Sequence, residues 1–370
     1  MKIGLHLPCL PHICIICLME VGIIGLPQSG KSSLFEALTG LKEGAPGTTS
    51  RTGVARVPDP RLKKLEELLR PKKAVPAEVK YIDVLLPPKG LTGALPAIQR
   101  ADALVLVIRA FKNDAVPHPQ IDLDPRRDLE ALSMELAFSD IAILEHRLEK
   151  LALQLKAAPS PERDTLHREQ SFLLGVKAAL EKETPVREQA LPEEWARALE
   201  SFALFTARPW LLVLNIGEED IPRTQALEEE WQARYPKLGM VALCARLEKE
   251  LSELPEAEAR EFRASLGLKE SAPDRLIRLC YELLGLISFF TVVSGEMRAW
   301  TVRRGTPALK AAGKVHTDIE RGFIRAEVIG YEDFLRAGSL AEARKKGHLR
   351  LEGKTYPVQD GDIITFLFNI

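Results

Sequence analysis

The sequence predicts an α/β fold that is built on a parallel sheet, carries an inserted α-helical hairpin and ends in a separate domain. Three observations predict this fold. Short apolar runs alternate with helix-forming stretches through residues 19–285. Leucines at helical spacing dominate the insertion, residues 126–200. Short strands, glycines and alternating hydrophobicity then fill residues 286–370.

Length and composition narrow the class of protein. The chain has 370 residues, which suits two or three domains. Its 51 basic and 52 acidic residues give a net charge of −1, which excludes an extended polybasic protein and a strongly acidic tail protein. Five cysteines are too few for a disulfide scaffold and favour a reducing compartment. Because no apolar run approaches transmembrane length, we expect a cytoplasmic protein that does not enter a membrane.

The first eighteen residues differ from the rest. They are apolar, carry one charge at Lys2, and are interrupted by Pro8 and Pro11. A signal peptide is one alternative, and a metal site is another. We expect instead that Met19 is the natural start and that residues 1–18 are a non-native or disordered extension. The alternative metal site would consist of Cys9, His12, Cys14 and Cys17.

Each element of the expected sheet follows from a local pattern. An apolar strand at residues 21–24 leads through a glycine turn into a helix at residues 31–38. Residues 44–53 are small and polar, which is typical of a loop. Short apolar runs of the kind found in buried parallel strands follow at residues 79–86, 103–108, 210–214 and 241–243.

The insertion begins with an amphipathic helix. From Asp128, leucines recur at steps of three, four or seven over about 30 residues, a length of about 40 Å. Residues 158–161 interrupt this pattern, and a second helical stretch follows at residues 162–182. An antiparallel hairpin is the simplest arrangement, with two ordinary packing helices as the alternative.

Residues Gly25 to Ser32, GLPQSGKS, match the phosphate-binding pattern Gly-x4-Gly-Lys-Ser/Thr between a strand and a helix. The glycines let successive N–H groups point at phosphate oxygens. Lys31 places a positive charge near the β- and γ-phosphates, and Ser32 contributes its hydroxyl to Mg²⁺. The expected nucleotide contacts in this segment are Gly25, Pro27, Gln28, Ser29, Gly30, Lys31, Ser32 and Ser33.

Asp83 ends an expected strand, where an Asp in this fold class holds the metal through water. A cap or turn role is the alternative. We predict Lys31 and Asp83 as the catalytic residues. The usual glycine three positions later is missing, because the chain reads Asp83-Val84-Leu85-Leu86 and has no glycine until Gly90. No water-positioning side chain follows Asp83, so a general base cannot be assigned.

The element that reads the base is expected after the strand at residues 210–214. Guanine-specific proteins have Asn-Lys-x-Asp there, whereas this chain has Asn215-Ile216-Gly217-Glu218. A longer carboxylate does not fit the bidentate pairing with guanine, so we expect guanine selectivity to be lost and ATP to bind, with GTP as the alternative. Asn215, Ile216, Glu218, Cys244 and Ala245 complete the expected nucleotide contacts.

Several longer motifs resemble one known family. They include the phosphate loop and NIGE, VPDPRL at residues 57–62, RAWT at 298–301, HTDIERGFIRAEVIGYEDF at 316–334, and LEGKTYPVQDGDIITFLFN at 351–369. From Met19 to Ile370 the chain resembles the YchF / Obg-like ATPase family of P-loop proteins. The resemblance implies a P-loop NTPase domain, a helical arm and a C-terminal β-grasp (TGS) domain. It also implies ATP preferred over GTP, slow hydrolysis, and association with the ribosome through its large subunit or RNA, by a protein that we expect to be a monomer.

The chain departs from the family in both switch regions. The segment after Asp83 is shorter, and the first switch is altered. We take Thr49 as the third metal residue beside Ser32 and Asp83, with Thr48 as the alternative. Nucleotide binding survives such changes more easily than hydrolysis does. Three hypotheses therefore remain: a slow ATPase that acts as a switch on the translation machinery, a nucleotide-binding adaptor with negligible hydrolysis, and a GTP-binding protein.

The last domain is mildly basic. Residues 286–370 hold thirteen Lys or Arg against ten Asp or Glu, a net of +3. Arg344-Lys345-Lys346, with His348 and Arg350, forms a basic cluster. The resemblance favours contact with ribosomal RNA or protein there, and a solvated surface is the alternative.

Overall fold

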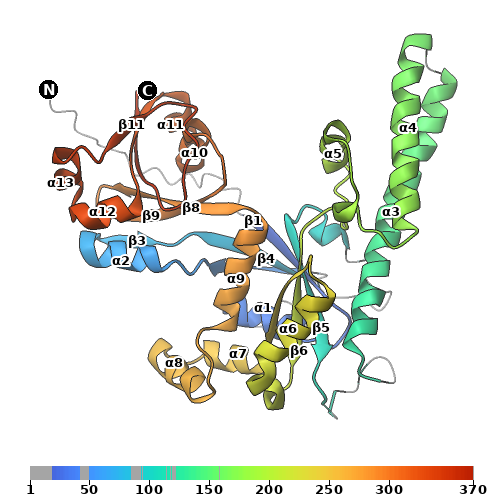
Figure 1. The fold of residues 1–370 in the computed structure, drawn as a ribbon, viewed down its shortest axis with the longest axis horizontal. Coiled ribbons are helices and arrows are strands. Elements are labelled where there is room, and N and C mark those ends of the chain that lie inside the picture. The colour runs from blue at the N-terminus through green and yellow to red at the C-terminus, as the bar shows by residue number, and fades with distance from the viewer. Residues whose placement is uncertain are drawn as a thin grey trace. The chain divides into compact units, whose positions relative to one another are not determined.

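A computed structural model describes residues 19–41, 50–84, 93, 95–113, 115–116, 118, 122–157 and 159–369. The expectations for residues 1–18, for Thr48 and Thr49, and for most of residues 85–93 lie outside this part of the chain. The described residues form two compact units, which Figure 1 shows from blue to red along the chain. One unit comprises residues 19–58 and 78–284, and the other comprises residues 59–77 and 285–369.

The first unit is built on a six-stranded sheet with the order β2-β4-β1-β5-β6-β7. Neighbouring strands from β4 to β7 are parallel, while β2 is antiparallel to β4. Every residue of β6 is buried, as expected for a parallel strand whose two faces are both covered. The sheet confirms the predicted α/β fold. Its strands are β1 (Met19–Ile24), β2 (Ser50–Arg56), β4 (Glu78–Val84), β5 (Ala103–Ala110), β6 (Trp210–Ile216) and β7 (Gly239–Leu243).

Helices connect these strands. α1 (Lys31–Thr39) follows β1 directly, as the sequence predicts. The 3₁₀ turns are η2 (Leu95–Ile98), η3 (Val186–Glu188) and η4 (Glu218–Arg223). The later helices of this unit are α6 (Thr224–Arg234), α7 (Ala245–Ser252), α8 (Glu256–Ser265) and α9 (Ala272–Leu283).

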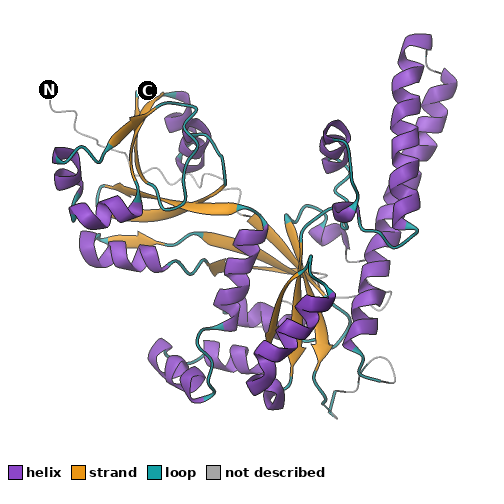
Figure 2. Ribbon diagram, in the orientation of Figure 1, coloured by secondary structure: helices purple, strands orange, loops and turns teal. Residues whose placement is uncertain are grey.

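The insertion is a helical hairpin, as predicted. α3 (Pro125–Ala157) and α4 (Ser160–Leu180) run side by side in Figure 2, and the short helix α5 (Glu193–Glu200) follows. The first turns of α3 belong to the core of the sheet through Leu129, Leu132 and Leu136. Farther along, Leu144 and Leu151 pack with α4 in a separate hydrophobic cluster. No helix in the described ranges is both long enough and apolar enough to cross a bilayer.

The predicted loop at residues 44–53 is wrong for its last residues, because β2 begins at Ser50. Its side chains alternate across the strand: Gly53 and Ala55 are buried, while Thr52, Val54 and Arg56 are exposed. All seven residues pair with β4, from Ser50 opposite Val84 to Arg56 opposite Glu78. The polar composition of this segment is typical of a loop, so the sequence did not predict the strand that lies here at the edge of the sheet.

The second unit is built on another six-stranded sheet, with the order β11-β10-β12-β8-β9-β3. β8 is antiparallel to β9 and parallel to β12, and α10 packs its alanines against the sheet, which is a β-grasp arrangement. The strands are β3 (Lys73–Val75), β8 (Leu286–Val293), β9 (Glu296–Arg303), β10 (Phe323–Ile329), β11 (Arg350–Glu352) and β12 (Ile363–Phe368). The helices are α2 (Pro60–Leu69), α10 (Ala308–Val315), α11 (Thr317–Arg321), α12 (Tyr331–Ala337) and α13 (Leu340–Lys345).

Residues 59–77 depart from the expected domain boundaries. The sequence places them within the block 19–285, whereas in the structure they join the C-terminal unit. β3 pairs in parallel with β9, and Arg61 donates to both carboxylate oxygens of Asp360 at 2.9 and 3.1 Å. The chain therefore leaves the first unit after β2 and returns to it at β4.

Candidate nucleotide-binding site

The loop between β1 and α1 requires its glycines. A Cβ atom at Gly25 would clash with the carbonyl oxygen of Val107 and with Ser29 Oγ. Gly30 has φ of 89°, and a Cβ atom there would clash with Asn215 Nδ2. Both positions therefore need the close backbone approach that only glycine allows.

The loop presents polar groups that have no partner in the described part of the chain. Ser29 is 1% exposed, and its Oγ makes no hydrogen bond to a described residue. No side chain caps the N-terminus of α1, so its first N–H groups are available to an anion. Pro27 and Gln28 are exposed at the tip of the loop, and Ser33 is half-buried in α1.

Lys31 is the buried cation of the loop. It is 8% exposed, and burial lowers the pKa of its ammonium, against the opposing charge of Asp83. A buried ammonium is costly without an anionic partner. The position is therefore suited to a phosphate.

Asp83 lies beside Ser32, the other described residue that is predicted to hold a metal. Ser32 Oγ donates a hydrogen bond of 3.1 Å to Asp83 Oδ2. Asp83 is fully buried, and its other oxygen, Oδ1, has no partner among the described residues. An unpartnered buried carboxylate oxygen beside a hydroxyl fits a hydrated Mg²⁺.

Sequence reasoning missed Arg51, which contacts this same pair. Its Nε donates to Asp83 Oδ2 at 2.9 Å, and one terminal nitrogen donates to the backbone oxygen of Ser32 at 3.1 Å. The other terminal nitrogen donates to Glu36 Oε1 at 3.0 Å. The missing signal was strand alternation, since Arg51 shares the inward face of β2 with Gly53.

Glu36 connects Arg51 to a second cation. Its Oε2 lies 2.7 Å from Lys249 Nζ of α7. Burial acts to raise the pKa of Glu36, but the hydrogen bonds from Lys249 and Arg51 bring it below the ordinary value. Glu36 is therefore ionised at neutral pH and holds both cations in place.

Asn215 joins the phosphate loop to the predicted base-reading residues. Its Nδ2 donates to the Ser29 backbone oxygen at 2.8 Å, and its Oδ1 accepts from the Ala245 N–H at 2.9 Å. Cys244 lies just before α7, where burial raises the pKa of its thiol and the charge of Glu218 adds to this rise. The structure thus brings Asn215, Ala245, Cys244 and Glu218 to the same end of the sheet, and Ile216 is buried in the hydrophobic core.

Comparison with known proteins places this geometry in a family. The model named YchF-GTPase_C, described as "Protein of unknown function (DUF933)", matches residues 286–369, and the model described as "50S ribosome-binding GTPase" matches residues 20–136. The "Ribosome-binding ATPase YchF" of Bacillus subtilis is 37% identical over 95% of this chain and 100% of its own length. The chain belongs to the YchF family.

Further relatives also match this chain over nearly its full length. The Escherichia coli O157:H7 "Ribosome-binding ATPase YchF" is 34% identical over 95% of this chain and 99% of its own. "Obg-like ATPase 1" of Caenorhabditis elegans is 33% identical over 95% and 92%. The solved YchF GTPase of Schizosaccharomyces pombe has a TM-score of 0.85 at 29% identity, covering 94% of this chain and 97% of that structure.

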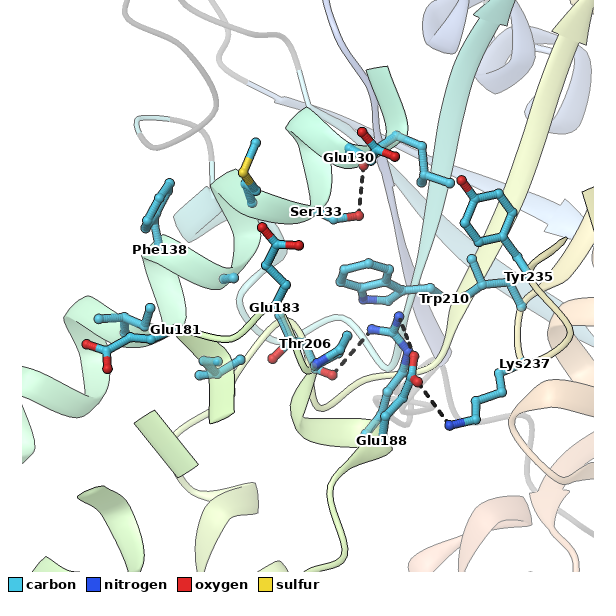
Figure 3. Close-up of a pocket in the computed structure, with 18 of the residues that line it drawn as sticks. Glu130, Ser133, Phe138, Glu181, Glu183, Glu188, Thr206, Trp210, Tyr235 and Lys237 are labelled. Carbon is cyan, nitrogen blue, oxygen red and sulfur yellow. Dashed lines mark hydrogen bonds and ion pairs between the residues drawn. The ribbon is translucent and has the colours of Figure 1, made fainter. Parts of the chain in front are cut away.

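A cavity of about 620 Å³ lies apart from the YchF phosphate loop, beside the first half of α3 (Figure 3). Its lining includes Trp210, Phe138 and Arg187 but none of the predicted phosphate-loop residues. The Arg187 guanidinium stacks 3.7 Å from the Trp210 ring centroid, and burial lowers the pKa of Arg187 to about 10. This cavity is therefore not the predicted nucleotide site.

Proposed function

We propose that this chain binds ATP with Mg²⁺, hydrolyses it slowly, and acts as a nucleotide-dependent switch on the ribosome. One observation carries the nucleotide site. The buried Lys31 ammonium, the uncapped start of α1 and the Ser32–Asp83 pair lie together around one glycine loop. This arrangement offers cationic and N–H groups to phosphates and oxygens to a metal.

Mg²⁺ fits the oxygens at the end of β4. Ser32 would hold it directly and Asp83 through water, using the carboxylate oxygen that has no partner among the described residues. When bound, the ion would neutralise charge on the β- and γ-phosphates. Lys31 would contribute a second positive charge from the loop, and Asn215 would keep the loop in register with residues 244–245.

The residues near the base favour ATP over GTP. Ile216 is buried and offers only apolar contact, and Glu218 is one methylene longer than the aspartate that reads guanine. A specific observation keeps GTP as the second candidate, since the model described as a GTPase matches residues 20–136.

The test is competition binding of ATP and GTP against a fluorescent nucleotide at saturating Mg²⁺. We expect ATP to bind at least as tightly as GTP. A preference for GTP of tenfold, about 1.4 kcal/mol, would reject the ATP assignment. Single-turnover hydrolysis on the same samples separates a slow ATPase from a nucleotide-binding adaptor, and we expect a rate far below the enzyme median of about 10 per second.

The ribosome enters this proposal through the printed names of the relatives. Those proteins are called ribosome-binding, and two of them cover almost the full length of this chain. We propose the same partner here, in the cytoplasm and for a monomer. Co-sedimentation with ribosomes in ATP analogue, ADP or no nucleotide tests both the association and its dependence on nucleotide.

A further inference from the structure

The Arg51 side chain is held in place by several hydrogen bonds. All three nitrogens of its guanidinium donate hydrogen bonds, to Asp83, Glu36 and the Ser32 backbone oxygen, and its side chain is 11% exposed. The guanidinium also lies 4.7 Å from the Phe35 ring centroid. Arginine suits such a position because its planar fork keeps a fixed geometry and its charge persists in a buried site.

The position of Arg51 follows from the approach of β2 to α1. A Cβ atom at Gly53 would lie 2.8 Å from Phe35 Cζ, so the strand packs directly on the helix. Strand alternation then aims residue 51 at the same face, toward the start of α1 and the end of β4. The strand thus delivers a permanent cation to the carboxylate that a metal would use.

The Arg51 guanidinium and a metal ion bound at Asp83 would repel each other, because both are positively charged. Arg51 Nε and Ser32 Oγ already share Asp83 Oδ2, at 2.9 and 3.1 Å. A divalent ion held by Ser32 and Asp83 would stand a few ångströms from the guanidinium. Like charges at such distances repel by an amount that grows as water is excluded. The same carboxylate would therefore bind a metal less tightly when Arg51 is present.

We propose that Arg51 is a built-in competitor of Mg²⁺ at Asp83, which raises the Mg²⁺ concentration that the nucleotide complex requires. The inference rests on the proposed nucleotide site. A bound ion would also weaken the side-chain contact between Arg51 of β2 and Asp83 of β4. Glu36 would remain as the alternative partner of the displaced guanidinium.

The experiment measures Mn²⁺ binding by electron paramagnetic resonance, with a non-hydrolysable ATP analogue and protein in excess over the analogue. Arg51→Gln removes the charge but keeps a long polar side chain. Arg56→Gln is the matched control, since it removes the same charge from an exposed position on the opposite face of β2. We expect Arg51→Gln to bind Mn²⁺ about tenfold more tightly than the wild type, and Arg56→Gln to match the wild type.

The possible results separate a failure of the proposed competition from a failure of the nucleotide site. Unchanged or weaker Mn²⁺ binding by Arg51→Gln, with the analogue still bound, overturns the competition and leaves the nucleotide site standing. An equal gain in both variants also overturns it, because the effect would then be one of general charge. Failure of the wild type to bind the analogue at any Mn²⁺ concentration rejects the nucleotide site itself, and the inference with it.

Arg51→Gln removes a charged partner from the buried carboxylate of Asp83, so this variant could misfold. A second measurement therefore uses the wild type. In protein labelled with ¹⁵N-arginine, the Arg51 Nε–H resonance is assigned by its loss in Arg51→Lys. We expect this resonance to shift when Mg²⁺ is added to the analogue complex, since the ion would compete with Arg51 for the charge of Asp83 and weaken their hydrogen bond. A resonance that stays fixed at saturating Mg²⁺ overturns the proposal.

Discussion

Lys31 contributes a positive charge that water reaches poorly. Charge-assisted hydrogen bonds of this kind contribute about 1.5–3 kcal/mol. We therefore expect Lys31→Ala to weaken ATP binding about tenfold or more, measured by fluorescent nucleotide titration. Lys182→Ala, at an exposed lysine in the turn after α4, is the control and should bind as the wild type does. Wild-type affinity in Lys31→Ala would contradict our assignment of the loop.

At this scale the sequence predicts what is local. Gly25, Gly30 and Lys31 stand in one short motif whose spacing already implies their geometry. Asn215 was predicted as a contact of the base, and the structure adds that it ties Ser29 to Ala245. Arg51 could not be predicted, because its partners Glu36 and Asp83 come together only when β2 pairs with β4. Whether these residues bind nucleotide stays a prediction.

Among the elements, the parallel strands and the helical hairpin were predictable because each carries a strong periodicity of its own. β2 was not, since small and polar residues at a sheet edge resemble a loop. The segment of residues 59–77 was not either. Its sequence has a helix start, with Asp59 capping α2 before Pro60, but nothing in it says which sheet β3 joins. Tertiary pairing decides that, and no local pattern encodes it.

Besides its leucines in the core of the sheet, α3 is tied to the rest of its unit by a buried carboxylate. Asp140 accepts hydrogen bonds of 2.7 Å from the N–H groups of Phe205 and Thr206. Asp140→Ala would leave both groups without this acceptor, at about 1–3 kcal/mol for each buried group. We expect chemical denaturation to show that loss of stability. Glu135→Ala, at an exposed position on the same helix, should change stability by less than about 0.5 kcal/mol.

The wild type and Asp140→Ala should also differ in how their stability depends on pH. Burial raises the pKa of Asp140 above its ordinary value of 3.8, and the two N–H donors oppose this only in part. The folded protein therefore holds this proton more tightly than the unfolded chain does. The stability advantage of wild type over Asp140→Ala should be largest below pH 3.8 and should fall as pH rises through the raised pKa. An advantage that grew with pH in this range would show that the hydrogen bonds outweigh burial.

At the scale of the whole molecule, three members of the basic cluster have carboxylates beside them. Arg344 donates to both oxygens of Glu327 at 2.9 and 2.8 Å, and Lys345 pairs with Glu342 at 2.8 Å. Arg350 lies 3.9 Å from carboxylates of Glu352 and Asp362. These carboxylates offset part of the cluster's positive charge, and contact with the ribosome through the cluster stays a prediction.

We expect a triple alanine substitution of residues 344–346 to change ribosome co-sedimentation by less than about threefold, because Arg344 and Lys345 already pair with carboxylates and would release few counterions. The measurement compares wild type and variant at low and moderate salt, with ATP analogue, with ADP and without nucleotide. A loss of tenfold or more that is largest at low salt and smaller at moderate salt would restore the cluster as the docking surface.

Because residues 59–77 belong to the C-terminal unit, the two units cannot be separated by a single cut in the chain. A truncated protein ending at residue 284 would keep α2 and β3 but lose β9, the strand that β3 pairs with, and Asp360, a partner of Arg61. Such a fragment is not the first unit alone, since it carries an orphaned piece of the second between the strands that hold Arg51 and Asp83. A clean separation would replace residues 59–77 with a short linker from β2 to β4. If a simple truncation loses nucleotide binding that this linker variant keeps, the loss comes from the orphaned segment rather than from a role of the C-terminal unit.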